Sequence, residues 1–261
     1  MEPSLSQSQK MSWSIPIAII VGFGMIALAI FFTGGKKDAP GATENNPADT
    51  TATANSGLRP VDDTDYISGN PNAPILLVEY SDYDCPFCKQ FHETLDQIID
   101  EYGVTGRIAW VYRQFPIAQL HPNSPKISEA ALCVGDIGGN DAFWKFTNLI
   151  FQQRDITEPT NVTLLPEYAE SAGISREAYI ECMDSGRMEA AVTASIEDGF
   201  NAGARGTPYT VLIAGNQQAV IDGARSYDTV KGIVKNLIDQ LDGNFNPTAD
   251  EVPEASAAVH Q

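Results

Sequence analysis

Between about residues 61 and 245 the sequence predicts an α/β domain whose mixed sheet is interrupted by a block of helices. Three observations predict this class. A strand, a helix and a second strand follow one another over 75–112, helical spacing dominates from about 125 to 200, and two β runs and a helix occupy 209–241. The two halves of the sheet are therefore expected on either side of a helical insertion at about 125–200.

The first predicted strand is Ile75–Tyr80, a nearly continuous apolar run that begins just after Pro74. Such a run is typical of a central strand buried on both faces. A helical pattern with an apolar face follows, and Arg107–Tyr112 is the next predicted strand. Two strands joined through a helix are expected to be parallel, with a right-handed connection.

Helical spacing then extends from about 125 to 200, with breaks expected at 135–140, at 158–160 and at Gly173. Gly215-Asn216 separates two further β runs, Tyr209–Ala214 and Gln218–Ile221, and favours a hairpin. The apolar spacing of Tyr227–Leu241 predicts a closing amphipathic helix.

The flanking segments have a different composition. No charged residue lies between Lys10 and Lys36, so we expect a short N-terminal segment, 1–12, and a transmembrane signal anchor at 13–33. A cleaved signal peptide is the alternative, but the apolar run continues beyond the small residues that would form its cleavage site. We expect a flexible linker at residues 34–60 and a disordered tail at residues 246–261, because both segments contain few large apolar residues.

The net charge of −18 lies entirely in residues 61–261. Binding of nucleic acid is not expected, because phosphate contacts need a basic face. Solubility is the simplest explanation of the acidity.

The sequence Cys85-Pro86-Phe87-Cys88 lies where the first predicted strand meets the first predicted helix. Proline suits the first helical position, and Cys85 would then face the unpaired N–H groups and the positive end of the helix dipole. These features lower the pKa of a thiol, whereas Cys88, one turn further, is expected to be more buried and to resolve mixed disulfides. A zinc site is the alternative, but it needs two more ligands and no second closely spaced pair exists.

The stretch from Leu77 to Cys88, LVEYSDYDCPFC, resembles the active-site segment of DsbA-like thiol:disulfide oxidoreductases, especially the membrane-tethered members of the thioredoxin superfamily. Residues 113–116 with His121-Pro122, and then Gly206-Thr207-Pro208, follow in the same order. The similarity extends from about Asp65 to Leu241. It implies a thioredoxin-like fold with a helical insertion and an enzyme that exchanges disulfides with exported proteins.

The resemblance also implies roles for individual residues. Pro208 is expected to be cis and beside Cys85, with Thr207 pairing to an extended substrate and Pro86 and Phe87 contributing to substrate binding. Glu79 matches the buried acid that relays a proton to the second cysteine; the alternative is a strand-end residue that faces water.

Four further side chains carry expectations. Cys133 and Cys182 are expected to form a structural disulfide, with two free thiols or a second redox relay as alternatives. His92 is expected at the surface. Asp82 is equally consistent with a turn former and with a modulator of the site.

These features together predict a membrane-anchored, monomeric dithiol oxidase that needs no metal and no cofactor. The resemblance implies that its domain faces the periplasmic or cell-surface side, acts on exported proteins with free thiols, and is re-oxidised by a quinone-coupled membrane protein. An isomerase or reductase of the same fold is the alternative, and Thr207 leaves the direction open. A non-catalytic peptide-binding or chaperone domain is a third possibility.

Overall fold

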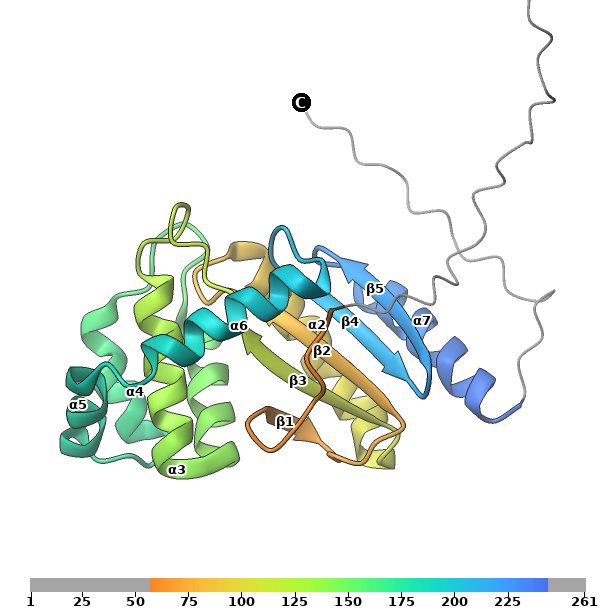
Figure 1. Ribbon diagram of the computed structural model, residues 1–261, viewed down its shortest axis with the longest axis horizontal. Coiled ribbons are helices and arrows are strands. Elements are labelled where there is room, and N and C mark those ends of the chain that lie inside the picture. The colour runs from red at the N-terminus through yellow and green to blue at the C-terminus, as the bar shows by residue number, and fades with distance from the viewer. Residues whose placement is uncertain (1–56, 244–261) are drawn as a thin grey trace, which may run out of the picture. The chain divides into compact units, whose positions relative to one another are not determined.

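A five-stranded mixed sheet forms the centre of the computed structural model, which describes residues 57–243 (Figure 1). The strand order is β1-β3-β2-β4-β5. β2 is parallel to β3 and antiparallel to β4, so the expected parallel pair and the hairpin are both confirmed. The strands are β1 (Tyr66–Gly69), β2 (Ile75–Ser81), β3 (Ile108–Gln114), β4 (Tyr209–Ala214) and β5 (Gln217–Asp222).

Helices cover both faces of this sheet. α6 lies in front of the sheet in Figure 1, α2 and α7 lie behind it, and α3, α4 and α5 lie at one end. The helices are α2 (Pro86–Tyr102), α3 (Ser124–Gln153), α4 (Leu165–Ser171), α5 (Arg176–Ser185), α6 (Glu189–Ala202) and α7 (Tyr227–Leu241), with short 3-10 turns at Gly103–Thr105 and Val162–Leu164. The thioredoxin-like arrangement with a helical insertion is therefore confirmed.

Alternation along β2 distributes its side chains between two cores. Ile75 and Leu77 pack with α2, α3 and α7, whereas Val78 and Tyr80 pack in a smaller core that includes residues of α6. Successive strand residues point to opposite faces, so a strand buried on both sides is apolar almost throughout. Glu79, on the α2 face, is the charged exception.

Several expectations need correction. β1 was not predicted; its four residues pair antiparallel to β3, and a segment this short carries little sequence signal. The break expected at 135–140 is confirmed as a kink within α3, because Gly139 has the non-helical dihedrals φ 73° and ψ −169° and separates two helical parts. Residues 57–60, expected in the linker, contact the domain: the Arg59 N–H donates to Asp198 Oδ1 at 2.7 Å.

The predicted anchor at 13–33, most of the linker and the C-terminal tail fall outside the described residues. Between residues 57 and 243 no helix combines the length and apolar character that a membrane span requires.

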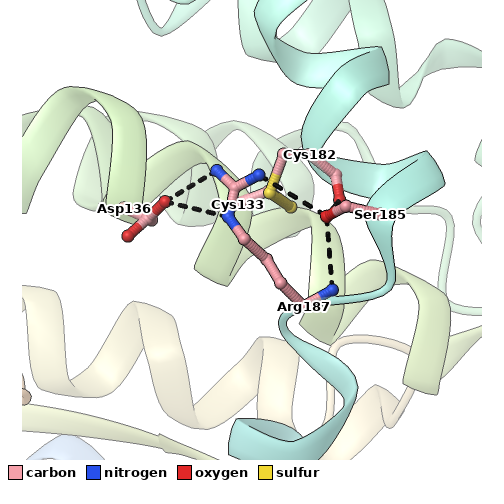
Figure 2. The surroundings of a disulfide bond; sticks show 5 residues. All are labelled: Cys133, Asp136, Cys182, Ser185 and Arg187. Carbon is pink, nitrogen blue, oxygen red and sulfur yellow. Dashed lines mark hydrogen bonds and ion pairs between the residues drawn. A yellow bond between two sulfur atoms is a disulfide. The ribbon is translucent and has the colours of Figure 1, made fainter.

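A disulfide joins Cys133 on α3 to Cys182 on α5, with the two Cα atoms 5.8 Å apart (Figure 2). Both cysteines are buried, and Arg187 adds an ion pair to Asp136 beside the bond. The bond therefore ties together two helices of the insertion through cysteines that are 49 positions apart in the chain.

Replacing both insertion cysteines by alanine is expected to lower the free energy of unfolding by about 4 kcal/mol, because the unfolded chain regains the entropy of an open loop. Denaturant unfolding of the double variant and the wild type, both with Cys85 and Cys88 reduced, measures this change. An unchanged midpoint would show that the bond does not stabilise the insertion.

Candidate active site

The first cysteine is placed by a tight turn between β2 and α2. The Cys85 N–H donates to the carbonyl oxygen of Asp82 at 3.1 Å, which closes a turn directly after the strand. Cys85 is the N-cap of α2 and Pro86 is its first residue, where a missing N–H costs no helical hydrogen bond. The sequence thus begins a helix at the position where the thiol can interact with its unpaired donors.

The Cys85 thiol lies beside the turn that leads into β4. Its Sγ donates to the carbonyl oxygen of Thr207 at 3.5 Å, and the Thr207–Pro208 peptide bond is cis. Cys85 is only 5% exposed, but the neighbouring Phe87 is 60% exposed and Pro86 is partly exposed. Residues expected to bind substrate therefore surround a sulfur that lies close to the surface.

The pKa values of the two thiols are shifted in opposite directions. A hydrogen bond from the Cys88 thiol is the main factor that lowers the pKa of Cys85 to about 6, against the effect of burial, with smaller contributions from Thr207 and the backbone N–H groups of Cys88 and Phe87. Burial and then the nearby Cys85 raise the pKa of Cys88 well above its ordinary value. Cys88 is fully buried, and its Sγ accepts a hydrogen bond from the Asp82 N–H at 3.5 Å.

Glu79 lies on β2 and is fully buried, so the alternative that it faces water is wrong. Burial raises its pKa to about 8, although the Trp110 indole N–H donates to its Oε2 at 2.9 Å. The charge of Glu79 also contributes to the raised pKa of Cys88. A carboxyl group that is protonated near neutral pH therefore lies within electrostatic reach of the buried thiol.

The expectation that His92 lies at the surface is wrong. Its ring is buried and stacks on Phe151, with centroids 4.4 Å apart, and it also contacts Trp110. Burial lowers the pKa of His92 to about 3, so the imidazole is neutral. The reason is that this face of α2 packs against the insertion, which local sequence does not reveal.

Sequence reasoning left Asp82 open between a turn former and a modulator of the site, and it gave His121 no role of its own. Asp82 is fully buried, and its Oδ2 is 2.9 Å from His121 Nδ1. The available signals were an acid placed just after a buried strand and the His121-Pro122 pair. Within residues 57–243 no group of three or more His, Cys, Asp or Glu side chains is arranged to hold a metal ion.

Known proteins resemble this chain in sequence and in fold. Residues 62–236 match the family model described as "Thioredoxin". A segment is 33% identical over 126 residues to "Na(+)/H(+) antiporter NhaA 1" of Mycolicibacterium gilvum, covering 47% of this chain and 19% of that protein. "Putative protein-disulfide oxidoreductase RP025" of Rickettsia prowazekii is 31% identical over 138 residues, covering 52% of this chain and 48% of that protein.

The chain thus spans less than half the length of either of these two relatives. Among solved structures, oxidised BdbD from Bacillus subtilis superimposes with a TM-score of 0.62 at 22% identity, covering 70% of this chain and 97% of that one. Because the identity is only 22%, this similarity is evidence for the fold alone. Because the family model covers most of the described residues, the chain belongs to the thioredoxin family.

Proposed function

We propose that the protein is a thiol:disulfide oxidoreductase that forms disulfide bonds in exported proteins through Cys85 and Cys88. The observation that carries the proposal is the placement of the two thiols. Cys85 is the N-cap of α2 beside the Thr207 carbonyl oxygen, where its pKa is lowered, whereas Cys88 is fully buried and its pKa is raised. A stabilised Cys85 thiolate favours the reduced enzyme, which makes the disulfide form an oxidant.

The catalytic cycle starts from the enzyme disulfide. A substrate thiolate attacks Cys85 Sγ, the bond between the enzyme sulfurs breaks, and Cys88 leaves as a thiolate that takes up a proton. A second substrate thiolate then attacks the substrate sulfur of the mixed disulfide and expels the Cys85 thiolate. The substrate loses two electrons, and the enzyme pair gains them.

Thr207 and Pro208 support substrate binding in this cycle. The carbonyl oxygen of Thr207 lies 3.5 Å from the reactive sulfur, so backbone groups there can pair with an extended segment of substrate. Backbone pairing tolerates many sequences, which suits an enzyme that acts on many proteins. The exposed Phe87 ring adds an apolar contact beside the sulfur.

Glu79 supplies the proton for Cys88 and recovers it later. With a pKa of about 8 the carboxyl group carries a proton near neutral pH, and the poorly acidic Cys88 thiolate accepts it readily. Because both groups are buried, bulk water is an inferior donor.

An extracytoplasmic location fits the Cys133–Cys182 bond, since structural disulfides persist in oxidising compartments. We also propose that the protein is a monomer anchored in the membrane through residues 13–33, with its domain on the periplasmic or cell-surface side. A quinone-coupled membrane protein would re-oxidise Cys85 and Cys88.

Equilibration with reduced and oxidised glutathione tests the direction of electron flow. The Cys85/Cys88 couple is expected at about −180 to −120 mV, the range of disulfide donors, because the Cys85 thiolate is stabilised. Thiol trapping at defined ratios measures it, with Cys88→Ser as the control that cannot form the bond. A value near −270 mV, typical of reductases, would overturn the oxidase assignment.

Reduced protein should show one thiol that titrates with a pKa of about 6. Ultraviolet absorbance of the thiolate, followed against pH, measures it. Cys85→Ser should abolish the transition. If the transition occurs instead near the ordinary cysteine value, the proposed activation is wrong.

Glu79→Gln should make stability less dependent on pH. In the folded protein the Glu79 carboxyl group keeps its proton up to about pH 8, whereas an ordinary glutamate carboxyl group loses it near pH 4.5. The folded state therefore binds the extra proton in that window, and the contribution of Glu79 to stability falls as the pH rises through it.

The difference in free energy of unfolding between the oxidised variant and oxidised wild type, followed from about pH 5 to 8, isolates this effect because no active-site thiol titrates. The free energy of unfolding of the variant, relative to that of the wild type, should increase as the pH rises. A constant difference would place the Glu79 pKa in its ordinary range.

A further inference from the structure

The carboxylate of Asp82 is buried between the redox site and the helical insertion, and it accepts four hydrogen bonds. Its Oδ1 accepts from the Asp84 N–H at 2.8 Å and from Ser124 Oγ at 2.6 Å. Its Oδ2 accepts from the Ile117 N–H at 2.7 Å and from His121 Nδ1 at 2.9 Å. Donors from three separate segments therefore converge on one side chain.

The backbone of the same residue contacts both cysteines. The Asp82 N–H donates to Cys88 Sγ at 3.5 Å, and its carbonyl oxygen accepts from the Cys85 N–H at 3.1 Å. Any rotation of the Asp82 peptide units would move a donor away from one sulfur and release the N–H of the other cysteine.

The side-chain bonds restrict this rotation. The bond from Asp84 closes a local turn within the active-site segment. The bonds from Ile117 and Ser124 fix that turn to the β3–α3 connection and to the first residue of α3. The Thr160 N–H donates to Asp84 Oδ1 at 2.9 Å, which attaches the turn to the insertion a second time.

A carboxylate is the side chain that fits these contacts. Two oxygens offer about four acceptor sites and no donor, and all four are used. An asparagine of the same size would turn an N–H₂ group toward two of the four donors. Charge-assisted bonds also offset the cost of burying the carboxylate.

We propose that Asp82 is a positioning residue of the redox site, holding its own backbone so that the Cys85 and Cys88 sulfurs keep the environment required for exchange. This inference rests on the proposed function. It links the start of α3 to the site, since Ser124 is the first residue of α3 and Ile117 and His121 lie in the connection that leads to it.

Asp82→Asn in the full-length protein tests the proposal. The pKa of Cys85 should rise by half a unit or more, an increase of about threefold in the thiol-to-thiolate ratio. The equilibrium constant with glutathione should shift toward the enzyme disulfide by a similar factor, because the reduced form loses thiolate stabilisation. Thiolate absorbance and thiol trapping provide the two readings.

Asp198→Asn is the matched control. Asp198 is also buried and accepts from the Arg59 N–H, the Tyr80 hydroxyl and Arg113, but none of these contacts involves a cysteine. Both variants should lose stability, and only Asp82→Asn should change the Cys85 pKa. An unchanged pKa in Asp82→Asn, or equal changes in both variants, would overturn the proposal.

If Asp82→Asn does not fold, Ser124→Ala decides the question by removing one bond. A raised Cys85 pKa would support the positioning role, and an unchanged one would refute it. The titration needs no substrate, so it remains informative even if the wild type fails to exchange disulfides, a result that would reject the proposed function alone.

Discussion

The start of α2 stabilises a negative charge on Cys85, and the remaining features of the site depend on that interaction. Backbone N–H groups in the first turn of a helix lack carbonyl partners, so an anion at the N-cap satisfies them and interacts favourably with the dipole. Cys85 occupies this cap. The thiol of Cys88, in the same first turn, does most to lower its pKa, and the N–H groups of Cys88 and Phe87 add smaller contributions. Cys88, one turn deeper, is surrounded by protein and responds in the opposite direction.

The sheet keeps these groups in register. β2 places Glu79 beneath the helix and ends at Ser81, so that the following turn brings Asp82 against both cysteines. On the opposite face, Arg113 bridges Asp65 and Asp198 and attaches the start of the described chain to α6. The Arg113 cluster thus fixes the sheet to the start of the described chain and to α6, whereas the contacts of Asp82 reach the two cysteines.

Local signals were sufficient to predict most of the fold. Apolar runs identified β2 and β3, Gly215-Asn216 identified the hairpin, and Pro86 after Cys85 identified the start of α2. What could not be predicted depends on contacts between distant segments. β1 exists because β3 offers it an edge, His92 is buried because α3 covers it, and the four donors to Asp82 meet only in the folded chain.

The most direct test of this account is to map alkylation in the reduced protein by mass spectrometry after a brief exposure to iodoacetamide at mildly acidic pH. The account predicts modification of Cys85 with Cys88 left unmodified, because only the former is both ionised and near the surface. Equal modification of both cysteines, or preferential modification of Cys88, would contradict it.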